Sequence, residues 1–111
     1  MSADPHVVYV TVPEMLDAAR IAREVVSARL AACANIMPNI QSVYHWDGEV
    51  CLSDEVVIVF KTTGDRVVEL THMVVDEHPD EVPCVTSWPI TDGNPEYLKW
   101  VRDEATGQPQ G

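Results

Sequence analysis

The sequence predicts an α+β domain built on one four-stranded antiparallel sheet. Segments typical of strands and helices follow one another in the order β-α-β-β-α-β, and one further helix comes after them. Two of the strand segments are apolar without interruption, whereas the other two contain prolines. A strand buried on both faces reads as a continuous apolar run, and proline is confined to edge strands or bulges. The two uninterrupted apolar strands are therefore expected in the middle of the sheet, and the two strands that contain prolines are expected at its edges.

The first strand is predicted over residues 6–12, where β-branched residues predominate. A proline follows it, and proline is favoured at the first position of a helix. Ala19, Ala22, Val26 and Leu30 then recur at intervals of three or four residues, which is the spacing of a single helix face. We expect these four side chains to form the buried face of a helix that ends near Leu30.

A long hairpin comes next. Residues 33–46 have an extended pattern with a proline inside it, which predicts one long strand at an edge of the sheet, kinked or bulged at the proline. Asp47-Gly48 is the strongest short-range signal for a tight hairpin turn. The return strand is expected over 49–61, with an interruption at 53–54 and an apolar stretch after it that is typical of a central strand.

A second helix is predicted to end near Glu77, because His78 precedes a proline and such a residue resists helical geometry. The fourth strand is expected over 81–90, at a sheet edge because it contains two prolines. Asn94-Pro95 then predicts the start of a short helix. Right-handed crossovers between these elements give a ferredoxin-like (split β-α-β) sheet with the spatial strand order 4-1-3-2.

The edge strand at 33–46 predicts self-association. It carries Val43, Tyr44 and Trp46, and it is longer than the helices that could cover it. A long exposed apolar edge would aggregate unless another chain pairs with it. We expect it to pair with the fourth strand of a neighbouring copy. Because those are different edges, the contact must close into a ring, for which we predict a homotrimer.

Composition and charge exclude several classes of partner. The 111-residue chain has 7 Lys and Arg against 18 Asp and Glu, a formal charge of −11. This balance excludes nucleic acid as the main partner and disfavours anionic membranes. No segment approaches the ~20 apolar residues of a membrane span, and the polar residues 1–6 do not resemble a signal peptide. Residues 1–106 are expected to form a single domain, with 107–111 as a flexible tail.

The three cysteines, Cys33, Cys51 and Cys84, contain no C-x-x-C pair, which excludes a zinc ribbon or a thioredoxin-type redox motif. Free thiols are typical of a reducing compartment, so we expect a cytoplasmic protein. Cys33 lies among apolar residues and is expected in the core, since free cysteine is among the most buried residue types.

Five short motifs in a fixed order resemble those of the CutA divalent-cation tolerance family. They are residues 30–38 (LAACANIMP), 42–46 (SVYHW), 61–63 (KTT), 78–83 (HPDEVP) and 93–100 (GNPEYLKW). The resemblance extends over about residues 6–104. It implies a ferredoxin-like cytoplasmic homotrimer, similar to PII-type signalling proteins, with a role in tolerance to copper and other divalent metal ions.

His78, Glu81 and Cys84 are the candidate metal ligands, because they are three residues apart and imidazole, carboxylate and thiolate all bind copper or zinc. In a regular strand, Glu81 and Cys84 would point to opposite faces. The alternative is that His78 caps the preceding helix, Glu81 is solvated or paired with Lys61, and Cys84 contributes to packing.

Lys61 precedes two threonines and a predicted helix start, an arrangement that can hold an anion. With Trp46 and Glu81 it is the candidate lining of a ligand cleft between subunits. Two alternatives to metal tolerance therefore remain, a PII-like sensor of an anionic small molecule and a structural adaptor. We expect no enzyme, because no glycine-rich phosphate loop, H-E-x-x-H motif or Ser-His-Asp order is present.

Overall fold

The computed structural model of the chain describes residues 3–108. Its elements are β1 (Pro5–Val12), α1 (Met15–Ser27), β2 (Cys33–Trp46), β3 (Glu49–Thr63), a 3-10 turn (Gly64–Arg66), α2 (Val67–Glu77), β4 (Cys84–Pro89) and α3 (Pro95–Glu104). The four strands form one antiparallel sheet in the order β2-β3-β1-β4. The predicted fold class and strand order are thus confirmed, with β1 and β3 in the middle.

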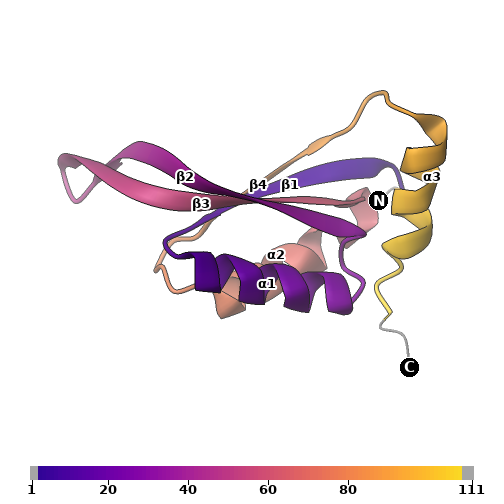
Figure 1. The fold of residues 1–111 in the computed structure, drawn as a ribbon, viewed down its shortest axis with the longest axis horizontal. Helices are drawn as coiled ribbons and strands as arrows, with labels where there is room; N and C mark the ends of the chain where they lie inside the picture. Colours follow the sequence, from indigo (N-terminus) through magenta and orange to yellow (C-terminus); the bar gives the residue numbers. More distant parts are fainter. Residues whose placement is uncertain (1–2, 109–111) are drawn as a thin grey trace.

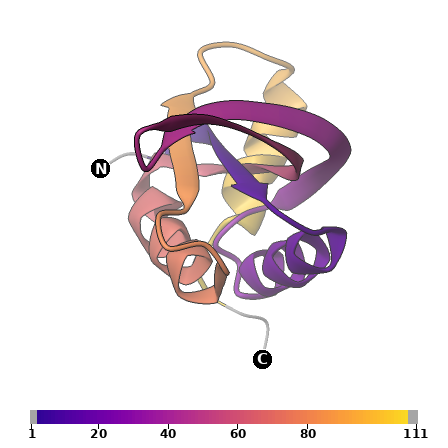
Figure 2. The same cartoon turned by 90° about the vertical axis from the view of Figure 1, so that its left-hand side faces the viewer.

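The two faces of the sheet have different surroundings. Helices α1 and α2 lie side by side against one face, and α3 stands at the end of the sheet opposite the hairpin tip (Figures 1 and 2). The side chains that point toward α1 and α2 form the core, since side chains alternate along a strand. They are Val8, Val10 and Val12 of β1 and Val56, Ile58 and Phe60 of β3. The opposite face, called the open face below, carries the intervening side chains.

Helix α1 differs from its prediction in length and in buried face. Its buried residues are Ala18, Ile21, Ala22 and Val25, whereas Ala19 is exposed. The helix ends at Ser27 because Arg29 adopts a left-handed conformation with φ 58°. The N–H of Arg29 donates to the carbonyl of Val26, and that of Leu30 donates to the carbonyl of Val25, which are the hydrogen bonds of a Schellman cap. Leu30 is therefore buried beyond the helix.

The hairpin confirms the kinked strand and the tight turn. The β2–β3 register shifts between Met37 and Ile40, so the proline lies in a bulge of an edge strand. Asp47 and Gly48 have φ 51° and φ 79°, as the central residues of a type I′ turn require. The predicted interruption at 53–54 is wrong, because Ser53 pairs in register with Ser42 and β3 is continuous. Polar side chains on a solvated strand do not break its backbone pairing.

Strand β4 begins at Cys84 rather than at residue 81, because residues 78–83 form an irregular connection after α2. Helix α3 starts as predicted, with the Asn94 side chain accepting a hydrogen bond from the N–H of Glu96 at 3.1 Å. The predicted flexible tail lies partly outside the described residues, at 109–111. Among residues 3–108, no helix is long and apolar enough to cross a membrane.

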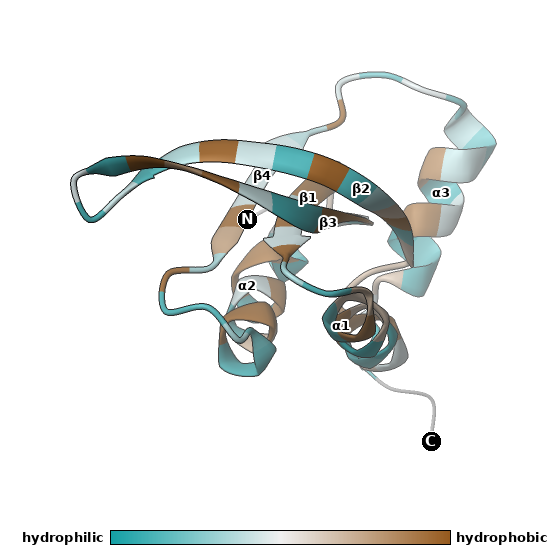
Figure 3. Cartoon of the chain, turned by 60° about the vertical axis from the view of Figure 1, so that its left-hand side comes forward, coloured by the Kyte–Doolittle hydropathy of each residue, from teal (hydrophilic) through white to brown (hydrophobic). Residues whose placement is uncertain are grey.

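The hairpin arm, residues 40–55, extends beyond the two helices (Figure 1). Hydrophobic and hydrophilic residues alternate along it (Figure 3), and its apolar side chains are exposed. Val43, Val50 and Leu52 are between 64% and 68% accessible. Val43 and Leu52 are cross-strand partners. An apolar surface of this extent is typical of an interaction site.

Candidate functional site

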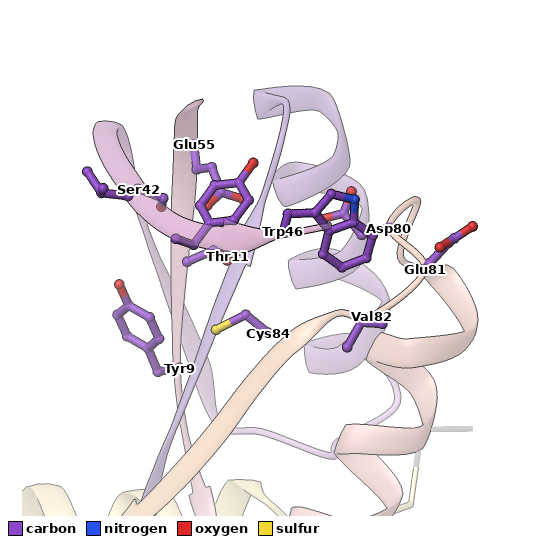
Figure 4. Close-up of a pocket in the computed structure, with 11 residues that line it drawn as sticks. Tyr9, Thr11, Ser42, Trp46, Glu55, Asp80, Glu81, Val82 and Cys84 are labelled. Atoms are coloured by element: carbon purple, nitrogen blue, oxygen red, sulfur yellow. The ribbon is translucent and has the colours of Figure 1, made fainter. Parts of the chain in front are cut away.

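A pocket of about 550 Å³ lies on the open face, between the hairpin arm and the 78–83 connection (Figure 4). Its lining comes from all four strands and from the connection. The residues are Tyr9, Thr11, Ser42, Val43, Tyr44, Trp46, Glu55, Asp80, Glu81, Val82 and Cys84. The strand register explains why they meet. Thr11 pairs with Cys84, and Glu55 pairs with Ile40, two positions before Ser42.

The pocket combines aromatic rings with carboxylates. Two tyrosines and a tryptophan line it together with Glu55, Asp80 and Glu81. Among the described residues that line it, none is basic. Glu55 is half-buried, and no hydrogen bond or ion pair engages its carboxylate within residues 3–108. The pocket therefore has an acidic, aromatic character.

His78 has a structural position next to this pocket. Its side chain is fully buried, and its Nε2 lies 2.7 Å from the carbonyl oxygen of Thr11. Its Nδ1 accepts a hydrogen bond from the N–H of Asp80 at 3.0 Å, so the proton is on Nε2, which donates to Thr11. The imidazole thus ties the 78–83 connection, and with it one wall of the pocket, to β1.

Two of the three candidate metal ligands, Glu81 and Cys84, are exposed and line one pocket, although Figure 4 shows their side chains pointing in different directions. The expected alternation applies to a regular strand, and β4 begins only at Cys84. Glu81 precedes the strand and escapes its alternation. His78 uses both ring nitrogens within the fold. In the part of the chain that the structure describes, no three His, Cys, Asp or Glu side chains are placed to hold a metal ion. The three-ligand site stays a prediction, and it would require His78 to break a hydrogen bond.

The three candidate ligand-binding residues do not lie together in the single chain. Trp46 and Glu81 line the pocket, whereas Lys61 lies at the other end of the open face, beneath α3. Its Nζ donates to Oδ1 of Asn35 at 3.3 Å and lies 5.8 Å from the centroid of the Tyr97 ring. Within residues 3–108, Lys61 makes no ion pair with Glu81. One cleft containing all three residues would need Lys61 from another copy.

Cys33 is half-buried on the open face rather than in the core, because it is the cross-strand partner of Lys61. Its Sγ lies 3.5 Å from the Tyr97 hydroxyl. The hydrogen bond to Cys33 and, to a smaller extent, burial raise the pKa of Tyr97 to about 12. The sequence predicts helix α3 but not the position of that helix against the sheet. The contact between Cys33 and Tyr97 was therefore not predicted.

Replacing Cys33 with alanine should move the titration of one tyrosine down toward its ordinary pKa near 10. The raised pKa adds stability below pH 10 that is lost as the pH rises through about 12, so the variant should also lose this alkaline dependence. Ultraviolet difference titration measures the change, with Cys51→Ala as the matched control. A titration curve identical to that of the unmodified protein would contradict the assignment.

Comparison with known proteins agrees with this architecture. A family model described as CutA1 divalent ion tolerance protein matches residues 6–104. The chain belongs to the CutA1 family. A solved CutA1 structure, the divalent cation tolerance protein from Thermus thermophilus, has a TM-score of 0.88 and 42% identity. The alignment covers 90% of this chain and 97% of that one. The family resemblance of the five motifs is thus confirmed.

Two curated CutA relatives show the extent of the match. The divalent-cation tolerance protein CutA of Thermus thermophilus is 43% identical over 97 residues, which are 87% of this chain and 94% of that protein. A protein named CutA homolog from Xenopus laevis is 47% identical over 95 residues, which are 86% of this chain. The matched region spans 63% of the Xenopus protein, so that relative is considerably longer than the shared domain.

Among the pocket residues that sequence reasoning missed in this CutA1 chain are Tyr9, Glu55 and Asp80. A signal for the first two was present. The Asp47-Gly48 turn fixes the hairpin register and thereby places Glu55 on the same face as Tyr44. The alternation of β1 puts Tyr9 on that face as well. Asp80 lies in an irregular connection, whose path no periodicity predicts.

Proposed function

We propose that this protein acts in cellular tolerance to divalent metal ions, with copper or zinc as the ion, and that it does so by weak metal binding rather than by catalysis. Membership of the CutA1 divalent ion tolerance family over residues 6–104 supports this role. The Thermus thermophilus relative is also named as a divalent-cation tolerance protein. The formal charge of −11 adds a field that concentrates cations near the surface.

The proposed metal ligands are Glu81 and Cys84. Both line one pocket and both are exposed, so an ion can reach them. A thiolate and a carboxylate are suitable donors for zinc, and thiolates select copper in its reduced state. Two protein ligands leave the remaining coordination positions to water or to a neighbouring copy. This incomplete set is the reason for expecting weak binding, and His78 remains within the fold.

We further propose that the functional form is a homotrimer in the cytoplasm. Strands β2 and β4 are the two free edges of the sheet, and pairing one with the other in successive copies requires ring closure. The exposed apolar side chains of the hairpin arm support burial against another copy. All three cysteines are free, as a reducing compartment would keep them.

Calorimetric titration tests the metal role. Zn²⁺, and Cu⁺ under anaerobic conditions, should bind with a defined stoichiometry, and Cys84→Ser or Glu81→Gln should weaken that binding about tenfold or more. His72→Gln, which removes an exposed histidine on α2, is the matched control and should leave binding unchanged. Equal binding by all four proteins, abolished by moderate salt, would mean that the ions are only counter-ions of the acidic surface.

A further inference from the structure

We propose that α3 and the residues after it, 105–108, form a strap that detaches and reattaches as one unit, and that Arg29 latches this strap to the rest of the domain. Figure 1 shows α3 at the end of the sheet opposite the hairpin tip, with the chain that leaves it passing the end of α1. The strap contains neither of the proposed metal ligands, so its role is separate from metal binding. All of the contacts described below lie within one chain and do not depend on a neighbouring copy.

The backbone of Arg29 has an unusual conformation for its residue type. Its φ is 58°, in the left-handed region, at the Schellman cap that ends α1. Glycine adopts this conformation without steric cost and is the usual residue there, whereas a residue with a Cβ is strained. Such a conformation persists where the surrounding contacts hold it, and it points to a role for the side chain.

The side chain of Arg29 reaches the C-terminal end of α3. Its Nη1 donates to Oε1 of Glu104 at 2.8 Å and to the carbonyl oxygen of the same residue at 3.4 Å. The Arg29 side chain is 20% exposed, so the ion pair is partly shielded from water and contributes more than a fully exposed pair would. A cation at this end of a helix also interacts favourably with the helix dipole. The guanidinium therefore fixes the end of α3.

The carbonyl of Arg29 holds the residues that follow α3. It accepts a hydrogen bond from the N–H of Gly107 at 2.7 Å. Gly107 has φ 74°, and a Cβ built on it would lie 2.5 Å from Nη1 of Arg66, just before α2. A side chain at this position would have to displace the Arg66 guanidinium, and glycine avoids both that contact and the strain of the positive φ. Arg29 thus anchors both the end of α3 and the chain beyond it.

The other end of the strap covers side chains on the open face. The Tyr97 hydroxyl lies 3.5 Å from Sγ of Cys33, and Nζ of Lys61 lies 5.8 Å from the centroid of the Tyr97 ring. Helix α3 has 10 residues, and isolated helices shorter than about 12–15 residues are marginal in water. A detached α3 therefore unfolds, and the amides of the whole strap lose their protection together. Opening of the strap would uncover Lys61 and Cys33, which makes it a conformational control on this end of the open face.

Hydrogen–deuterium exchange, followed by mass spectrometry on the full-length protein as it assembles in solution, tests this role. Arg29→Asn keeps a residue that tolerates the left-handed conformation, but its shorter side chain cannot reach Glu104. Exchange over residues 95–108 should become about tenfold faster or more, because the latch is lost, while exchange over α1 stays the same. Lys99→Gln is the matched control, since it breaks the exposed Lys99–Asp103 ion pair inside α3 and should change neither rate.

Unchanged exchange over residues 95–108 in Arg29→Asn would mean that other contacts, or a neighbouring copy, hold α3, and would overturn the latch. Equal acceleration of α1 and the strap would mean that Arg29 serves only as the cap of α1, which also overturns it.

Glu104→Gln provides a second measurement if Arg29→Asn does not fold, because it leaves the backbone of Arg29 unchanged. It should accelerate exchange over the strap about threefold or more, and an unchanged rate would likewise reject the latch. Both variants should bind Zn²⁺ as the unmodified protein does, since Glu81 and Cys84 are intact. Failure of the metal role and failure of the latch are therefore distinguished.

Discussion

Replacing His78 with alanine should lower the free energy of unfolding by about 3 kcal/mol, the largest effect that we expect from a single side chain next to the pocket. The substitution removes two hydrogen bonds, to the carbonyl of Thr11 and from the N–H of Asp80. It also leaves a cavity, because the side chain is fully buried. Urea unfolding followed by circular dichroism measures the loss.

His72→Ala is the matched control, since His72 is exposed on α2 and its replacement should change stability by less than about 0.5 kcal/mol. A second measurement separates a structural role from a metal-binding role. Addition of Zn²⁺ should stabilise the unmodified protein and the His78→Ala variant by similar amounts, because Glu81 and Cys84 remain. If the variant keeps full stability but loses stabilisation by Zn²⁺, His78 is a metal ligand and the packing role is contradicted.

Much of the fold could be predicted because two independent signals agreed. Uninterrupted apolar runs identified the central strands, and prolines identified the edges. Several of the errors concern positions where a helix cap or an irregular connection overrides the local pattern. Helix α1 ends earlier than predicted because Arg29 takes the left-handed position of a Schellman cap, where glycine is the usual residue.

The candidate site was predicted less well, for a reason that its residues make clear. Trp46 and Glu81 are 35 positions apart by number (81 − 46), and they meet only because the twisted hairpin arm lies over the 78–83 connection. Pattern predicts the face of a strand, but not where an irregular connection leads. Glu81 illustrates this, since it lies in the connection before β4 begins at Cys84, where strand alternation does not apply.

Leu52→Asp should dissociate the proposed trimer into monomers without unfolding them. In the single chain the side chain of Leu52 is 64% exposed on the hairpin arm, opposite Val43. An aspartate at this position is therefore solvated and lowers the free energy of unfolding only slightly. Buried against a second copy, the same carboxylate would be an unpaired charge inside an apolar contact. Self-association should therefore weaken about 100-fold or more, while the circular dichroism spectrum stays the same.

The matched control is Leu16→Asp, which makes the same chemical change on α1, where Leu16 is 84% exposed. Sedimentation of both variants across a range of concentrations compares the two surfaces directly. If association depends only on net charge, both variants weaken it equally, because each adds one negative charge to a chain at −11. If the hairpin arm is the contact, only Leu52→Asp does so. A trimer retained by Leu52→Asp would mean that this face of the arm stays in water, and the edge strands alone would then have to hold the ring together.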